Sequence, residues 1–295
     1  MMPVPITGDL PIVTAGRHMM AGQLAVLRDY LPDLRRSAEP TAVHESRKAI
    51  RRSFTLFKLY RPYFPSGELE PYRKGLRRIM RRLGPSRDLA VFRDKLTAYH
   101  ETFGYCLPNL VAYWAEEQAR IDEVLVTYLK QEEVRKFLNH YEGFIHSEDE
   151  TKAAGEPPPL LVRHVLPVLI YQRLGTVQSY GEILGTATLD QVHEMRIQFK
   201  ELRYTLSFFE ELLGVRASMM IEMTRLAQDH LGHLNDADVA IDMLKRCICC
   251  PDEVALYCEY QIEEIERLLQ EFPPLYKRFK QQRLRRRLAL SLVRL

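Results

Sequence analysis

The spacing of apolar residues along the chain is helical almost throughout. Hydrophobic positions recur every three or four residues, no convincing run of alternating β-branched residues occurs, and proline and glycine fall between the periodic segments. This pattern predicts an all-α protein. The predicted helices cover residues 17–36, 42–61, 69–83, 87–104, 109–130, 132–147, 160–184, 189–213, 217–231, 236–248, 252–271 and 275–293.

Proline and glycine mark where several of these helices are expected to end. Pro62 should stop the second helix, because proline donates no backbone N–H to the helical ladder. Gly84-Pro85 should stop the third helix, with Gly84 in the left-handed conformation that often follows a helix. Gly232 is expected to play the same part later in the chain.

A short pattern occurs twice along the chain. Val43–Arg47 reads Val-His-Glu-Ser-Arg, and Val192–Arg196 reads Val-His-Glu-Met-Arg. Further on, Leu83–Asp88 (Leu-Gly-Pro-Ser-Arg-Asp) is matched by Leu231–Asp236 (Leu-Gly-His-Leu-Asn-Asp). The histidines of the first pair are 149 residues apart, and the final aspartates of the second pair are 148 apart. Two ordered matches at nearly one offset indicate an internal duplication.

One segment between the two copies has the composition of a linker. Residues 147–159 read SEDETKAAGEPPP, which is polar, acidic and ends in three prolines. The chain is therefore predicted to consist of two all-α halves, residues 1–150 and residues 151–295, each a bundle of roughly four to six helices.

The net charge of +3 averages over strongly segregated blocks. Residues 42–96 hold 15 Lys or Arg against 5 Asp or Glu, whereas residues 114–150 hold 10 acids against 4 bases. Residues 276–295 contain eight bases and no acid. Separated basic blocks attract multivalent anions whatever the overall balance, so this distribution indicates a polyanionic partner.

The basic residues of the first block fall in rows along two predicted helices. Spacings of three and four residues from His44 place the cations of that helix on one face, opposite a packing stripe. Arginine suits a phosphate ligand because its planar fork binds two oxygens and keeps its charge. An ordinary solvent-facing surface is the alternative, but such surfaces usually alternate in sign. The candidate residues of these two helices are His44, Arg47, Lys48, Arg51, Arg52, Arg73, Lys74, Arg77, Arg78, Arg81 and Arg82.

The second copy keeps the plan of the first with less positive charge. Leu226, Asp229 and His230 stand where the first copy has Arg78, Arg81 and Arg82, so the first half is expected to dominate anion affinity. The candidate residues of the second half are His193, Arg196, Lys200, Arg203 and Arg225.

The doubled His-x-x-Arg helix, followed by Leu-Gly-x-x-(Arg/Asn)-Asp in an all-α chain, resembles the CHAD family, the conserved histidine α-helical domain. This resemblance covers most of the chain. It implies two helical bundles related by a pseudo-two-fold axis around a basic central cavity. It also implies binding of inorganic polyphosphate without catalysis, and a place at polyphosphate granules.

The resemblance assigns positions residue by residue. His44 and His193 match the family's histidines, and the cations carried over by position are Arg47, Arg51, Arg77, Arg196, Lys200 and Arg225. Asp88 and Asp236 match the acid after Leu-Gly, which caps a helix or orients a neighbouring arginine. Asp238 fits a second acid of the family, but the first copy has Ala90 there, which argues against a metal or catalytic role that needs this acid in both halves.

Two other functions fit the sequence less well. A nucleic-acid binder would use the same basic helices, but the basic face has few aromatic residues for stacking on bases, and no known reading motif occurs. A metal-dependent phosphohydrolase would need clustered metal ligands, whereas adjacent residues such as His44 and Glu45 project about 100° apart on a helix. No cofactor or metal is expected.

The remaining signals concern location and the C-terminus. Five cysteines without a paired framework, and a first segment unlike a secretion signal, favour the cytoplasm. No apolar run is long enough to span a bilayer. The spacing of Cys247, Cys249 and Cys250 is not typical of zinc. The basic helix at 275–293 could lie on a membrane surface, but its apolar stripe is expected to dock on the bundle.

Overall fold

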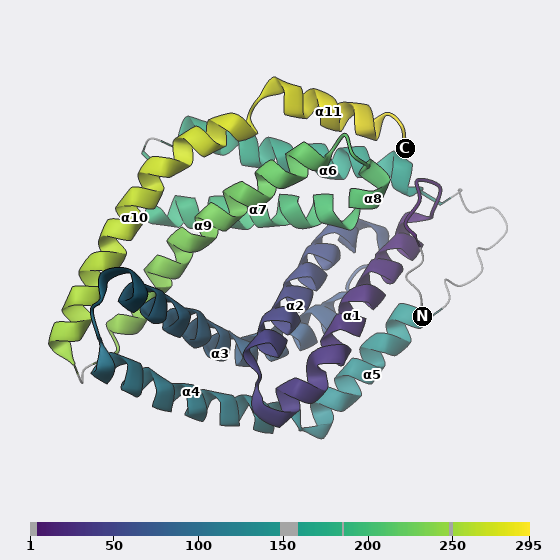
Figure 1. Cartoon of the computed structure of the whole chain (residues 1–295). Coiled ribbons are helices and arrows are strands. Elements are labelled where there is room, and N and C mark those ends of the chain that lie inside the picture. Colours follow the sequence, from purple (N-terminus) through teal and green to yellow (C-terminus); the bar gives the residue numbers. More distant parts are fainter. Residues whose placement is uncertain (1–4, 148–158, 185, 248–249) are drawn as a thin grey trace. The chain divides into compact units, whose positions relative to one another are not determined.

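The computed structural model describes residues 5–147, 159–184, 186–247 and 250–295, and it is all-α over these residues (Figure 1). No strand occurs among them, and an isolated antiparallel bridge joins Pro11 to Leu161. Two short 3-10 helices, Arg61–Tyr63 and Tyr180–Glu182, accompany the α-helices. The α-helices are α1 (Ile12–Ser37), α2 (Pro40–Tyr60), α3 (Glu70–Phe103), α4 (Pro108–Leu129), α5 (Glu132–His146), α6 (Val162–Ser179), α7 (Leu189–Phe208), α8 (Glu210–Leu213), α9 (Ser218–Leu244), α10 (Pro251–Phe279) and α11 (Gln282–Leu292).

The chain divides into two compact units. Over the described residues, the first comprises residues 16–147, 243–247 and 250–256, and the second comprises residues 5–15, 159–184, 186–242 and 257–295. The predicted linker at 147–159 lies almost entirely outside the described residues. The division of the sequence into repeats at residue 150 stays a prediction.

In the first unit α3 packs against both α2 and α4 (Figure 1). A close approach of α3 to α5 is possible because residue 75 is glycine: a β-carbon there would stand 2.0 Å from the Phe137 ring. Beside this contact, the ring of Tyr72 stacks on those of Tyr141 and Phe144. These contacts hold α3, which carries most of the candidate cations, firmly against the core of the unit.

In the second unit α6 packs against α7 (Figure 1). The rings of Phe272, Tyr276 and Phe279 on α10 contact the ring of Phe199 on α7. Phe199 on α7 is fully buried and meets the ring of Phe279 edge to face, with centroids 5.1 Å apart. Tyr276 donates a hydrogen bond to the carbonyl of Gln178 at 2.8 Å, which links α10 to the end of α6. Burial raises the pKa of this Tyr276 hydroxyl to about 12.

The third predicted helix does not stop at Gly84-Pro85, and this prediction was wrong. Residues 69–83 and 87–104, expected as two helices, are parts of the single helix α3. A proline inside a helix costs about 3 kcal/mol, because a hydrogen bond is lost and the ring crowds the preceding turn. The cost is offset because the buried stripe continues in register on both sides, through Leu83, Ser86 and Leu89.

Two further boundaries differ from the prediction for the same reason. Gly232 does not end a helix: it lies inside α9, whose buried positions continue from Leu231 to Leu234. The segments predicted at 252–271 and 275–293 are divided differently, because α10 runs through Pro273 and Pro274 to Phe279 before α11 begins. By contrast, α2 ends at Tyr60, next to the proline that was expected to stop it.

The C-terminal helix α11 docks through its apolar stripe, as predicted. Leu284, Leu288 and Leu292 are all buried, and α11 contacts α6 and α8 within the second unit. Among the described residues, no helix combines the length and the apolar character needed to cross a bilayer.

Candidate functional site

Arg47 joins the two repeated motifs of the first unit. It lies on α2, its side chain is 9% exposed, and its Nη2 donates to the Oδ1 of Asp88 on α3 at 3.2 Å. Its Nη1 lies 3.1 Å from the point where a β-carbon on Gly84 would stand. The glycine of Leu-Gly-Pro-Ser-Arg-Asp therefore makes room for the guanidinium, and the aspartate of the same motif orients it.

His44 begins the row of candidate cations on α2. Partial burial lowers the pKa of its imidazole, and the positive charge of Arg87 lowers it further. The charges of Lys48 and Arg51 also lower this pKa, whereas the negative charge of Glu45 raises it. Although Glu45 lies 3.7 Å from the His44 Nε2, burial and the nearby cations together lower the pKa and so favour the neutral form.

Four of the predicted cations are held by other groups. Lys48 pairs with Glu45 at 3.0 Å, and Arg52 donates to the amide oxygen of Gln23 on α1 at 3.0 Å. Arg73 and Lys74 both face Glu70, at 2.6 and 3.9 Å. These four residues contribute positive charge to the surface, but their side chains are already partly engaged.

The other cations of α3 lie in two rows. Helical spacing puts Arg77 and Arg81 on the face that Gly84 and Asp88 turn toward α2. Arg78 and Arg82 form the neighbouring row, on the α4 side, where the Arg82 guanidinium lies 5.3 Å from the ring centroid of Tyr128. All four arginines are exposed.

Most of the arginines in these rows form no ion pair among the described residues. Within the described part of the chain, no carboxylate forms an ion pair with Arg51, Arg77, Arg78 or Arg81. Adjacent like charges on a helix repel, so the rows carry an unfavourable electrostatic energy that a bound anion would relieve.

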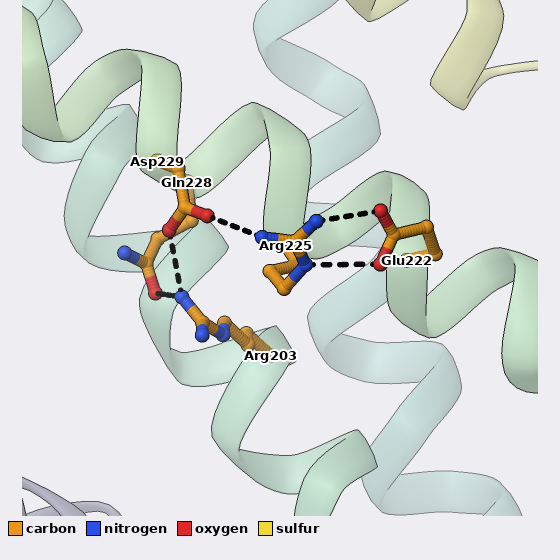
Figure 2. A network of polar contacts seen from close by, with 5 residues as sticks. All are labelled: Arg203, Glu222, Arg225, Gln228 and Asp229. Atoms are coloured by element: carbon orange, nitrogen blue, oxygen red, sulfur yellow. Dashed lines mark hydrogen bonds and ion pairs between the residues drawn. The ribbon is translucent and has the colours of Figure 1, made fainter.

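Two candidate cations of the second unit, Arg203 and Arg225, are paired with acids (Figure 2). Glu222 holds Arg225 with two hydrogen bonds of 2.9 and 2.7 Å. Asp229 bridges two arginines, accepting from Arg203 at 2.9 Å and from Arg225 at 3.1 Å. By the offset of the duplication, Glu222 stands where the first copy has Lys74, and Asp229 stands where it has Arg81. Two positions that hold a cation in the first copy thus hold an acid on α9, and these acids neutralise Arg225.

The sequence matches a known protein family over most of its length. The CHAD domain family matches residues 18–245. The chain belongs to the CHAD family. None of the curated proteins matches it significantly.

Solved structures share the CHAD fold seen here. The crystal structure of the CHAD domain from the plant Ricinus communis matches with a TM-score of 0.75 at 16% identity, over 92% of this chain and 95% of that chain. PptA from Streptomyces chartreusis matches with a TM-score of 0.67 at 13% identity, over 92% of this chain and 100% of that chain. At such identities the likeness shows the fold alone.

Within this CHAD domain only some of the predicted binding residues lie close together. His44, Lys48 and Arg51 share one electrostatic neighbourhood, whereas Arg52 turns toward α1 and Arg82 toward α4. In the second unit His193 is exposed, and Arg196 and Lys200 are half-buried.

Sequence reasoning missed three features of the site. Arg87 was not selected, although it adjoins the motif aspartate and acts on His44. Gly84 was assigned to a helix end and not to the space beside Arg47. Tyr128 on α4 had no signal in the sequence, because only the packing of α3 on α4 brings it to Arg82.

The cysteines give no further site of this kind. Cys247 and Cys250 are buried with their sulfur atoms 3.7 Å apart, and Cys249 lies outside the described residues. Over the described residues, no three His, Cys, Asp or Glu side chains are grouped as a metal would require.

Proposed function

We propose that this chain binds inorganic polyphosphate without catalysing its breakdown, and that its main binding surface is formed by α2 and α3 of the first unit. One observation carries the proposal: Arg51, Arg77 and Arg81 lie on these packed helices, and none of them is paired with a carboxylate among the described residues. The CHAD family membership supports it, because the resemblance implies polyphosphate as the ligand.

The spacing of the cations suits a linear chain of phosphates. Arg77 and Arg81 are one helical turn apart, about 6 Å along the axis, so both can contact one extended anion. Each guanidinium can bind two oxygens of a phosphate, and the bound charge would remove the repulsion within the row. Affinity should then fall steeply with salt, by the release of counterions known from nucleic acids.

His44 and Arg47 have different parts in this proposal. Arg47 is buried and oriented by Asp88, so it presents charge from a fixed position beneath the exposed row. The pKa of His44 is lowered by burial and by the nearby cations, and a bound anion would raise it, so that His44 takes up protons as the anion binds.

The proposal assigns a minor part to the second unit, where Arg203 and Arg225 are held by acids. Its candidate cations His193, Arg196 and Lys200 would add contacts to a long chain. The internal duplication, the pseudo-two-fold relation, the basic central cavity and the cytoplasmic, granule-associated location that the resemblance implies all stay predictions.

The test replaces the half-buried Arg51 and the exposed Arg77 and Arg81, and it leaves the buried Arg47 in place. The variant Arg51→Gln/Arg77→Gln/Arg81→Gln should bind long-chain polyphosphate about 100-fold more weakly in a filter-binding titration, if each arginine contributes about 1 kcal/mol. The slope of log affinity against log salt should become shallower by about 2.

A matched control removes the same charge elsewhere. The variant Arg120→Gln/Arg135→Gln/Arg267→Gln loses three arginines that acids already neutralise, and it should bind like the wild type. Equal losses in both triple variants would overturn the proposed surface. Displacement of polyphosphate by an equal charge of duplex DNA would favour nucleic acid, and release of phosphate from polyphosphate with Mg²⁺ would contradict a non-catalytic role.

A further inference from the structure

The exposed side of α11 is strongly basic and lies beyond residues 18–245, the part that matches the CHAD family. Arg283, Arg285, Arg286 and Arg287 are all exposed. The sequence contains no acidic residue after Glu271. Over the described residues, no carboxylate forms an ion pair with any of these four arginines. This charge is therefore uncompensated within its own unit.

The position of α11 is fixed by its buried side. Leu284, Leu288 and Leu292 are packed within the second unit, so the helix cannot turn this stripe outward without undocking. A ligand must therefore meet the opposite side of the helix as it stands.

Two apolar side chains stand on that opposite side. Helical spacing of three and four residues places Arg283, Arg286, Leu290 and Val293 in one outward ridge. Leu290 is 55% exposed and Val293 is 84% exposed. Their neighbours on the helix surface are arginines, including Arg287 and Arg294. A basic ridge with apolar tips is thus presented to solvent.

We propose that this ridge of α11 binds an anionic lipid surface, with the arginines at the headgroups and the Leu290 and Val293 side chains dipping between them. Clustered Lys and Arg on a helix are attracted to negatively charged leaflets, and small apolar side chains gain free energy when they leave water for the headgroup boundary. The stripe facing the protein takes no part, so the fold is unchanged on binding.

Other polyanions fit the ridge less well. Leu290 and Val293 offer nothing to a phosphate chain, which has no apolar part. The exposed residues of α11 include no aromatic side chain on which a nucleic-acid base could stack. The two apolar tips therefore favour lipid over nucleic acid and over polyphosphate.

The test uses the full chain and sedimentation with vesicles in about 0.1 M salt. The wild type should bind phosphatidylcholine vesicles that contain roughly 30% phosphatidylserine, and it should not bind phosphatidylcholine alone. The variant Arg283→Gln/Arg286→Gln/Arg287→Gln should bind on the order of 100-fold more weakly. The variant Leu290→Ser/Val293→Ser, which changes only exposed side chains, should lose about tenfold.

The control is Arg120→Gln/Arg135→Gln/Arg267→Gln, which removes equal charge at arginines that acids already neutralise and should keep its vesicle binding. Equal loss in this control, or unchanged binding in Leu290→Ser/Val293→Ser, would overturn the assignment to α11 and lipid. Binding of duplex DNA that depends on Arg283, Arg286 and Arg287, without binding to anionic vesicles, would also overturn it. Circular dichroism of each variant confirms that the fold is kept.

Discussion

The guanidinium of Arg47 lies against the backbone of Gly84, with Nη1 3.1 Å from the point where a β-carbon would stand. Asp88, one turn further along α3, accepts a hydrogen bond from the same guanidinium. The two repeated sequence motifs of the first unit therefore form one structural feature: one supplies the arginine, and the other supplies the space and the counter-charge.

Gly84→Ala tests the space beside Arg47, and Gly232→Ala is its matched control. Alanine in a helix interior is favoured over glycine by roughly 1 kcal/mol. A β-carbon at Gly232 would meet nothing within 4 Å, so this variant should gain that stability and keep its polyphosphate affinity. Gly84→Ala should gain less stability and should bind polyphosphate more weakly, because the Arg47 side chain must shift. Chemical denaturation and filter binding measure both effects, and identical behaviour of the two variants would refute the role of Gly84.

Glu222→Gln/Asp229→Asn should strengthen polyphosphate binding. The change releases Arg203 and Arg225 from their acids, so the affinity should rise about tenfold if the two arginines together contribute about 1.4 kcal/mol. Stability should change little, since these side chains are largely exposed and ion pairs in such positions contribute little to folding. Glu117→Gln/Glu132→Gln changes the net charge equally in the first unit, and it should have the smaller effect on affinity. A larger gain in this control would contradict the interpretation.

Polyphosphate affinity should rise as the pH falls, in part through His44. Its pKa is lowered in the free protein by burial and by Arg87, and a bound polyanion raises it. Between the pKa of His44 in the free protein and its higher pKa in the complex, the complex holds more protons than the free protein. The affinity therefore increases as the pH falls through this range, and it levels off below the pKa of the free protein. Titrations between about pH 8 and 5.5, which span the ordinary imidazole value, should show a smaller rise for His44→Asn. Equal slopes for both proteins would exclude His44 as the linked group.

Gly75→Ala should destabilise the first unit. The added β-carbon would stand 2.0 Å from the Phe137 ring, and overpacking of this kind costs about 1–3 kcal/mol. Gly143→Ala on α5, where nothing lies within 4 Å, should instead be neutral or stabilising. Thermal unfolding compares the two, and a stable Gly75→Ala variant would show that α3 and α5 can separate at little cost.

The helical class and most helix positions followed from apolar spacing, because each long helix buries one stripe. The errors lay at Gly84-Pro85, Gly232 and Pro273, where local helix-breaking residues were given more weight than the spacing. At all three positions the buried stripe continues in phase, as from Leu83 to Ser86, and tertiary packing prevails over the local preference.

The presence of the cations can be read from the sequence, but their arrangement cannot. Composition identified the cations of the first half, and the exchange of Arg81 for Asp229 already indicated a weaker second half. Which cations share a neighbourhood could not be predicted, because it depends on how α3 packs on α2 and α4. The engagement of Arg52 with Gln23 and of Arg82 with Tyr128 follows from that packing alone.

The continuity of α3 through Gly84-Pro85 has a consequence for ligand selection. Because Arg77, Arg81 and Arg87 lie on one unbroken helix, their backbone positions are fixed before any ligand arrives. The backbone of the proposed binding surface is therefore preorganised, and the entropy lost on binding belongs to the anion and to the arginine side chains. Among anions of equal charge, a stiff or cyclic phosphate whose charges are already spaced by one helical turn should lose less entropy on binding than a flexible chain does. Calorimetry can measure this difference.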